Sequence, residues 1–590
     1  MKNKMVSAAR GELSLDLSIE NIKLVNVFTG EIYPAAIGIF EDKIVHVTRP
    51  GETALEAKQV IDGKGKYAIP GLIDTHLHIE SSMLTPWAYA EAVLPHGTTT
   101  IVTDPHEIGN VLGAEGVDYM IKASKGLALR ILTFLPSCVP SAPGVETSGA
   151  DFTPEVIEEL INREDIDGLA EVMNYVGVIQ QDDRMPKILE AAKKAGKIAQ
   201  GHAPTVTGRD LSAYLVSGVD SDHECRTGEE ALEKIQAGMF VEIRESSFSL
   251  NAAAICEYIK DKGYLPNVCL CSDDVKANDL LQRGHMNHVV RRCIEEGISP
   301  VNAIRYGTLN AAERLKRRDL GAIAPGRIAD IVLLENIETM VVSDVFTSGK
   351  QIFSDGKLLR EQNKVNPPSR FFNTVKVPDI KEDDFTITVE QKGASKAKVR
   401  VIEYDYAPGI PTNFMEVTLP VVDGEIVLNH YDGKKAPLNY IGVYHRHGKN
   451  NNKTVGILAG YGIEEGAVAT SVAHDCHHLA VLGTNKKDRA LAANRVKELN
   501  GGMAAFKNGE LVAELPLPVA GLMSTATAEE LAPEIDKFVN LLEREIMPGK
   551  NPIHRLIAVT LPVIPKAKIS DLGLVDVDKQ EIVPLVLEVV

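Results

Sequence analysis

Alternating apolar and polar positions predict short β-strands in two separate stretches of the chain. Residues 20–47 contain the runs IKLVNVF, AAIGIF and KIVHV, separated by the turn-like TGE and EDK. A second set, IADIVLL, VSDVFTSG and KQIFSDGKLL, follows at 328–360, with SG and SDG turns that are typical of hairpins. We therefore expect β-structure at both 1–69 and 321–375.

Between these two sets, apolar runs alternate with segments that have helical periodicity. The runs, which number eight, are YAIPGLIDTHLHIE, TTTIVTDPHE, LRILTFLPS, IDGLAEVMNY, KIAQGHAP, VDSDHE, MFVEIRESS and NVCLCSDD. Amphipathic stretches such as PEVIEELINRED, MPKILEAAKKAG and GEEALEKIQAG lie between several of them. Strands that alternate with helices form parallel sheets. Eight such units predict an α/β fold, a (β/α)8 TIM barrel over residues 70–320.

The pattern changes again after Pro367–Pro368 and the charged run KEDD at 381–384. The strand-like runs VRVIEYDY, EIVLNHYD, YIGVYHRHG and TVGILAG are followed by the helix-like KDRALAANRVKEL and AEELAPEIDKFVNLLEREI. Mixed strands and helices behind a plausible linker predict an additional C-terminal α/β domain over residues 380–590.

Composition narrows the classes of partner. Of 590 residues, 44% are hydrophobic and 24% charged, which is typical of a globular protein. The formal net charge of -18 makes a nucleic-acid partner unexpected, because an acidic surface repels phosphates. The sequence shows neither a secretory signal nor a run of 18 apolar residues, so we expect no membrane partner. Seven scattered cysteines without a CxxC pair favour a cytoplasmic location and argue against a cysteine-based zinc site.

Candidate metal ligands stand at the ends of the predicted barrel strands. His76 and His78 form an H-L-H pair, and alternate residues of a strand face the same side. Later strand ends carry four further residues of ligand type: Glu171, His202, His223 and Asp273. All strand C-termini of a parallel barrel open on one face, so we expect these side chains to converge there.

Each of these residues alone also has a structural interpretation, as a loop histidine, a paired carboxylate or a helix cap. Their joint occurrence at strand ends favours a metal site. Six ligands exceed what one tetrahedral ion with an open position needs, so we predict two ions. His76, His78 and Asp273 would hold one ion, His202 and His223 the other, and Glu171 would bridge them. Imidazole and carboxylate ligands suit Zn, Mn or Fe(II), and a hydroxide between two ions is a nucleophile at neutral pH.

These residues, with the run GTLNAAERLKRRDLGAIAPGRIADIVLL, resemble the amidohydrolase superfamily. Within it, HIESSMLTP, VTDPHEIGNVLG, GLAEVMNYVGV, GHAP, SDHE and CSDD are similar to the adenine deaminase family, as are HRHG, SVAHDCHH and PLPVAGLMS near the C-terminus. The resemblance covers nearly the whole chain. It implies one composite β-sandwich from residues 1–69 and 321–375, and a C-terminal domain of the adenine deaminase type. Where many relatives bridge their metals with a carboxylated lysine, this sequence has Glu171.

The resemblance implies a metal-dependent hydrolase of purine salvage that converts adenine to hypoxanthine and ammonia. A metal-bridging hydroxide would attack C6, with Asp273 acting as general base and then acid. It implies two divalent transition-metal ions, Mn(2+) first, with Fe(2+) or Zn(2+) as alternatives. The partner would be a small purine base, and we expect a homodimer. The open alternatives are another cyclic amidase or deaminase, such as a hydantoinase or dihydroorotase, and a non-catalytic metal-binding protein.

Charge that develops on the ring nitrogen N1 needs a proton donor. We expect Glu107 or Asp104, in TDPHE, with His106 and Glu80 as further substrate-binding candidates. A carboxylic acid can donate only if burial or a like charge raises its pKa. TDPHE is also consistent with an Asp-Pro turn that opens a helix. Arg244, followed by Glu245 and Ser246, is a candidate reader of the purine edge.

Two other histidine patterns remain. His78 and Glu80 form an H-x-E, a fragment of the zinc nucleobase deaminase signature, but the required P-C-x-x-C is absent and we exclude that fold. In the predicted C-terminal domain, a set of histidines lies at i, i+3 and i+4 of an expected helix, and a pair lies along a strand: His474, His477 and His478, then His445 and His447. Metal binding is possible, while polar packing or contact with the neighbouring domain is commoner. We expect this domain to close over the barrel mouth or to form a dimer.

Overall fold

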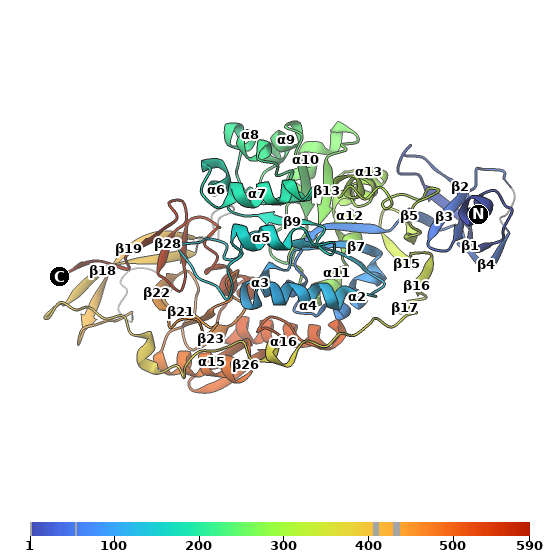
Figure 1. The fold of residues 1–590 in the computed structure, drawn as a ribbon. Helices are drawn as coiled ribbons and strands as arrows, with labels where there is room; N and C mark the ends of the chain where they lie inside the picture. Colours follow the sequence, from blue (N-terminus) through green and yellow to red (C-terminus); the bar gives the residue numbers. More distant parts are fainter. Residues whose placement is uncertain (1–2, 53–55, 405–411, 429–436) are drawn as a thin grey trace.

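The computed structural model describes residues 3–52, 56–404, 412–428 and 437–590 (Figure 1). Its centre is a curled parallel sheet. Five strands pair in the order β10-β9-β8-β7-β6 and three in the order β11-β12-β13. Single parallel bridges, Ala199 to Val219 and Leu77 to Asp273, link the two groups. All eight predicted strands are present, and the arrangement is TIM-barrel-like. The strands are β6 (Leu72–Leu77), β7 (Thr98–Thr103), β8 (Arg130–Leu135), β9 (Gly168–Val172), β10 (Ile198–Gly201), β11 (Ser221–Asp222), β12 (Phe240–Arg244) and β13 (Val268–Cys271).

Helices connect these strands and cover the outside of the sheet (Figure 1). They form where the sequence supplies caps and an apolar face. Helix α5 starts at Pro154, and the Thr153 side chain accepts a hydrogen bond from the Val156 amide. The helices are α2 (Pro86–Val93), α3 (His106–Leu112), α4 (Ala114–Ser124), α5 (Pro154–Leu160), α6 (Tyr175–Gln180), α7 (Met185–Lys194), α8 (Gly208–Val216), α9 (Gly228–Gln236), α10 (Ala252–Ile259), α11 (Ala277–Arg283), α12 (Met286–Glu295), α13 (Pro300–Tyr306) and α14 (Leu309–Arg314).

The two strand sets that flank the barrel in sequence share one nine-stranded sheet. Its order is β17-β16-β15-β14-β5-β1-β2-β3, with β4 paired to β1. The halves meet where β14 pairs antiparallel with β5, Val332 opposite Ile69. The strands are β1 (Leu15–Val25), β2 (Ile32–Phe40), β3 (Lys43–Val47), β4 (Ala57–Asp62), β5 (Tyr67–Pro70), β14 (Ile331–Asn336), β15 (Val341–Thr347), β16 (Lys350–Ser354) and β17 (Lys357–Leu358).

The C-terminal part is built on a ten-stranded sheet of order β20-β19-β18-β22-β21-β24-β23-β25-β26, with β30 on β18. Of the predicted run EIVLNHYD, only 425–428 lies within the described residues, and β20 is its strand. The elements are β18 (Lys396–Tyr404), β19 (Thr412–Val422), β20 (Glu425–Ile426), β21 (Asn439–Tyr444), β22 (Lys453–Ala459), β23 (Ala467–Thr470), β24 (Leu479–Gly483), α15 (Lys486–Glu498), β25 (Gly502–Lys507), β26 (Glu510–Pro516), α16 (Ala528–Glu545), α17 (Pro552–Ala558), β27 (Ala567–Ile569), β28 (Leu574–Asp576), β29 (Glu581–Val583) and β30 (Val586–Val589).

The predicted helix at His474–His478 is wrong. Residues 471–478 form the turn-rich connection between the antiparallel strands β23 and β24, whose pairing fixes both ends of the segment. His477 also has a left-handed φ of +51°, which interrupts a right-handed helix. We refer to residues 471–478 as the β23–β24 loop.

The C-terminal part packs against the barrel. Helix α16 contacts α11 and α2, and a bridge joins Leu84 to Ser524 (Figure 1). One apolar cluster runs across both, from Leu77 and Trp87 to Leu482. No helix of the described chain is long and apolar enough to cross a membrane.

The fully buried Arg446 fixes the β23–β24 loop. Its guanidinium donates only to oxygens, four of them backbone carbonyls: those of His477, Thr374, Ser471 and Ala520. Burial lowers the pKa of Arg446 to about 9. Two of these carbonyls, those of Ser471 and His477, belong to the loop, and the other two tie it to residues 374 and 520 through the same side chain.

Replacing Arg446 by Met should destabilise the protein by at least about 3 kcal/mol, because each buried carbonyl left without a donor costs about 1–3 kcal/mol. Thermal unfolding followed by circular dichroism measures this as a lower Tm. Arg318→Met is the matched control, because that side chain is 80% exposed. An Arg446→Met variant with the wild-type Tm would contradict this role.

Candidate functional site

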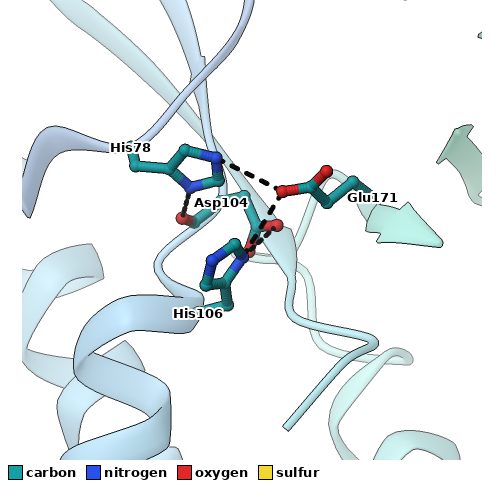
Figure 2. A group of neighbouring side chains, drawn as sticks. All are labelled: His78, Asp104, His106 and Glu171. Atoms are coloured by element: carbon teal, nitrogen blue, oxygen red, sulfur yellow. Dashed lines mark hydrogen bonds and ion pairs between the residues drawn. The ribbon is translucent and has the colours of Figure 1, made fainter. Parts of the chain in front are cut away.

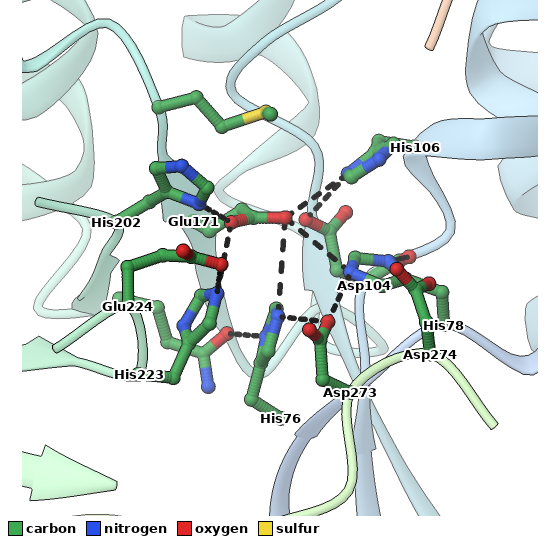
Figure 3. Close-up of polar contacts among 12 residues, drawn as sticks. His76, His78, Asp104, His106, Glu171, His202, His223, Glu224, Asp273 and Asp274 are labelled. Carbon is green, nitrogen blue, oxygen red and sulfur yellow. Dashed lines mark hydrogen bonds and ion pairs between the residues drawn. The ribbon is translucent and has the colours of Figure 1, made fainter. Parts of the chain in front are cut away.

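The carboxylate of Glu171, at the C-terminal end of β9, lies among the predicted histidines (Figure 3). Its Oε2 is 2.6 Å from His202 Nδ1 and 3.4 Å from His223 Nε2. Its Oε1 is 3.3 Å from His78 Nε2 and 3.8 Å from His76 Nε2. Each oxygen thus faces one of the two predicted histidine pairs, as expected of a bridging ligand.

Asp273 completes the predicted set from the end of β13. Its Oδ1 lies 3.5 Å from His76 Nε2 and 3.4 Å from His78 Nε2. Its Oδ2 accepts a hydrogen bond of 2.7 Å from Arg244. Asp273 has a left-handed φ of +58°, which is uncommon outside glycine and recurs at functional sites. All six predicted metal ligands therefore lie in one buried group.

The hydrogen bonds of the first histidine pair determine which nitrogens carry lone pairs. His78 Nδ1 lies 2.9 Å from the Asp104 carbonyl oxygen, which can only accept. His76 Nδ1 lies 3.2 Å from Gln200 Oε1, and the Gln200 amide nitrogen donates to the Thr75 carbonyl at 2.5 Å. Both rings therefore carry the proton on Nδ1 and direct the Nε2 lone pair at carboxylate oxygens.

A lone pair that faces a carboxylate oxygen at 3.3–3.8 Å is repelled unless a cation or a proton lies between them. In the second histidine pair, the nitrogen that lacks a partner is the one that does not face Glu171. Within the described chain, His76 Nε2, His202 Nε2 and His223 Nδ1 are buried without a hydrogen-bond partner. Imidazole nitrogens and carboxylates in this arrangement fit divalent transition metals.

The carboxylates of the centre are held ionised. Burial alone would raise the pKa of Glu171, but the charge and hydrogen bond of His202, with a further bond from His223, lower it well below its usual range. Burial is likewise outweighed at Asp273, whose pKa the Arg244 charge lowers well below its usual range. Two buried anions thus share one pocket of imidazoles.

Asp104 and His106 lie beside the centre (Figure 2). His106 Nδ1 is 2.9 Å from Asp104 Oδ2 and 3.7 Å from Glu171 Oε1. With His78, these residues offer ligand atoms that all lie within 4.8 Å of one another. Pro105 precedes helix α3, so TDPHE is both a helix-opening turn and part of the site.

The β23–β24 loop reaches this part of the barrel. His477 Nε2 makes a short hydrogen bond to Glu107, and His474 Nδ1 lies 3.4 Å from Glu107 Oε1. Asp475 Oδ1 is 3.9 Å from His106 Nε2. The expected contact between these loop residues and the neighbouring domain is confirmed.

Several acids here have raised pKa values. Burial, with the nearby charge of Glu107, raises the pKa of Glu80 to about 7. Burial and the Glu107 charge also raise the pKa of Asp475 to about 7, against the opposing charge of His106. Burial opposes protonation of His474, but the charge of Glu107 raises its pKa above the usual range. This side of the centre therefore holds groups that can donate protons near neutral pH.

A cavity of about 520 Å³ opens beside the centre, between the barrel and the C-terminal part. Asp273, Asp274, Arg244 and Ser246 line it from the barrel, and His474 and His554 from the opposite side. The rings of Phe248 and His554 stack at 5.0 Å with an interplanar angle of 16° in its wall. Of the predicted substrate contacts, Arg244 lines this cavity, whereas Glu80 and His106 do not.

Sequence reasoning missed four residues of the site. Gln200 orients His76, and Glu224 forms an ion pair with Arg244 beside His223. Asp274 and His554 line the cavity. Gln200, Glu224 and Asp274 each lie within two residues of a predicted ligand, and that proximity was the available signal. Glu245, which was singled out with Arg244 as a candidate reader of the purine edge, accepts a hydrogen bond from the Ala252 amide.

Two family models match this chain, each over its own range of residues. Residues 67–352 match the amidohydrolase family model, and residues 409–581 match the adenine deaminase C-terminal domain. A solved β-aspartyl dipeptidase from Fervidobacterium islandicum is 18% identical, covers 60% of this chain and 99% of its own, and superposes with a TM-score of 0.45.

Three curated relatives cover nearly the full length. The adenine deaminase of Kosmotoga olearia is 39% identical, over 98% of each chain. That of Thermosipho africanus is 39% identical, over 99% of each chain. Adenine deaminase 2 of Agrobacterium fabrum is 43% identical, over 90% of this chain and 87% of its own. With a match that spans the barrel, the flanking strands and the C-terminal domain alike, the chain belongs to the adenine deaminase family of amidohydrolases.

Proposed function

We propose that this protein hydrolyses adenine to hypoxanthine and ammonia at a two-metal centre in a closed (β/α)8 barrel. The observation that supports the site most directly is Glu171, whose two carboxylate oxygens face two different histidine pairs. Relatives that match nearly the whole chain and are named adenine deaminase support adenine as the substrate. The cavity beside the centre, about 520 Å³, has room for a purine base.

His76, His78 and Asp273 would hold one ion, His202 and His223 the other, and Glu171 both. The ligand set accepts Mn(2+), Fe(2+) or Zn(2+), and we expect Mn(2+) on the basis of the family resemblance. When bound, the ions supply Lewis acidity and lower the pKa of the attacking water.

Asp273 is the proposed proton carrier. It lines the cavity and, because its pKa is low, is ionised and able to accept a proton from the attacking water. A hydrogen bond from Arg244 orients this carboxylate. The Arg244 guanidinium stays protonated and does not take part in the proton transfer. The same group can then return the proton to the departing amine.

Glu107 and Asp104, the donors expected from the sequence, do not line the cavity, and the charges of His474 and His477 outweigh burial and hold the pKa of Glu107 well below its usual range. We therefore propose His474 as the donor to the ring nitrogen, acting with Glu107. His474 lines the cavity, and the Glu107 carboxylate 3.4 Å from its Nδ1 stabilises the imidazolium. Glu107 is thus a positioning residue for the donor, and Asp104 does the same for His106 through their 2.9 Å contact. Glu80, whose pKa is about 7, is a further acid near Glu107 that can supply a proton.

We also propose that the enzyme is a cytoplasmic homodimer. All seven cysteines are unpaired and buried, which suits a reducing compartment. Light scattering on the purified protein measures the oligomeric state.

Ammonia release tests the reaction. Protein expressed with manganese and with iron excluded should release ammonia from adenine, but not from cytosine, adenosine or dihydroorotate. Activity should disappear on chelation and return when metal is added, because the nucleophile depends on the ions. Turnover of dihydroorotate in place of adenine would favour a cyclic amidase and contradict the proposal.

Replacing Asp273 by Asn should lower kcat/KM for adenine by at least about 10²-fold, the low end of an acid–base contribution. Metal content is measured on the same sample to separate loss of the proton carrier from loss of an ion. Asp261→Asn, in the exposed 3-10 helix Lys260–Lys262, is the control and should keep the wild-type rate. Near-normal turnover by Asp273→Asn would refute its assigned role.

A further inference from the structure

A second histidine cluster lies away from the barrel centre, where the loop after β8 meets the C-terminal part. His445 and His447 follow β21, and His478 precedes β24. Their ring centroids are 5.2, 5.0 and 5.3 Å apart in pairs. His445 and His478 are each 3% exposed. None of the three is needed for the reaction proposed above.

One nitrogen of each ring is occupied by an acceptor. His478 Nε2 lies 2.7 Å from the Thr147 carbonyl, and His447 Nε2 lies 2.8 Å from the Cys476 carbonyl. A carbonyl oxygen only accepts, so both rings carry the proton on Nε2. The Thr147 hydroxyl donates to Asp571 at 2.6 Å and therefore accepts from His445 Nδ1 at 3.0 Å.

The other nitrogen of each ring has no such partner. Within the described chain, His445 Nε2, His447 Nδ1 and His478 Nδ1 are buried and make no hydrogen bond. If these nitrogens were protonated, the additional N–H groups would be buried without acceptors, which is unfavourable. Each ring thus has one N–H fixed by a protein oxygen and one buried lone pair. Metal-ligating histidines have this arrangement.

The spacing of the rings fits a common ion. With metal–nitrogen bonds of about 2.0–2.1 Å, three imidazoles on a tetrahedral ion have centroids roughly 5 Å apart. The three observed separations, 5.0–5.3 Å, agree with this value.

Asp571 supplies the negative charge of the cluster. Its Oδ1 lies 3.3 Å from His478 Nε2 and its Oδ2 3.8 Å from His445 Nδ1. These three residues offer ligand atoms within 4.8 Å of one another. Because the Asp571 oxygens lie on the N–H side of both rings and also accept from Thr147 and Asn452, the carboxylate orients the ligands.

We propose that His445, His447 and His478 bind one divalent transition-metal ion of the zinc type, oriented by Asp571 and Thr147. This ion would be additional to those of the barrel centre. It would join the segment after β21 to the β23–β24 loop, which also carries His474 and His477 to Glu107. The Thr147 hydroxyl and carbonyl, which accept from His445 and His478, link this structural site to the loop after β8.

Metal analysis of the intact protein tests the proposal. The double variant His447→Asn/His478→Asn should contain one ion per chain fewer than the wild type, whatever number the barrel holds. His46→Asn, on the surface of β3, is the control and should keep the wild-type content. Equal metal content in the double variant and the wild type would overturn the proposal.

A second measurement uses unaltered protein, in case the double variant folds poorly. Wild-type crystals grown with Zn(2+) should show an anomalous-scattering peak among His445, His447 and His478, separate from those of the barrel centre. Peaks at the barrel centre alone would overturn the proposal. Because the two positions are resolved from each other, failure here is distinguishable from failure of the catalytic centre.

Discussion

The active-site end of the barrel is organised around one buried carboxylate. Glu171 is 3% exposed, and removal of an anion from water is unfavourable unless opposite charge and hydrogen bonds replace the hydration. Five imidazoles contact it within 4.0 Å: His76, His78, His106, His202 and His223. At least two direct a lone pair at it instead of an N–H, so protein groups alone do not satisfy the site. A divalent cation bound among these groups would resolve that conflict.

The need of a buried carboxylate for charged and hydrogen-bonding partners also explains the role of the C-terminal region. Glu107 directly follows His106 in the sequence. Its partners, His474 and His477, come from a loop more than 360 residues later in the chain. Arg446 fixes that loop through its carbonyl oxygens. The proposed proton donor is therefore positioned by the packing of the C-terminal sheet against the barrel.

Much of the barrel could be predicted because its signals are local. Each strand is a short apolar run followed by a turn, and the ligands stand where these runs end. Strand ends of a parallel sheet meet at one edge, so His76 and Asp273 could be expected together although far apart in sequence. That the two flanking strand sets form one unit was expected only from the family resemblance, which implied a composite β-sandwich; in the structure they share one nine-stranded sheet.

The contacts of the C-terminal loop could not be read in this way. The spacing of His474, His477 and His478 suggests a helix, but the pairing of β23 with β24 overrides that local periodicity. The bond from His477 to Glu107 joins two elements with no shared sequence pattern. Such contacts depend on how two folded parts pack, which no short segment encodes.

The most direct test of the account is the metal content of Glu171→Gln. A neutral amide keeps the shape of the side chain but removes the charge that is shared by both histidine pairs. We predict that this variant loses at least one of the ions held by the wild-type barrel, together with adenine turnover. Glu257→Gln, at an exposed helix position, should change neither. A Glu171→Gln protein that retained the full wild-type metal content would contradict the bridging role on which the account depends.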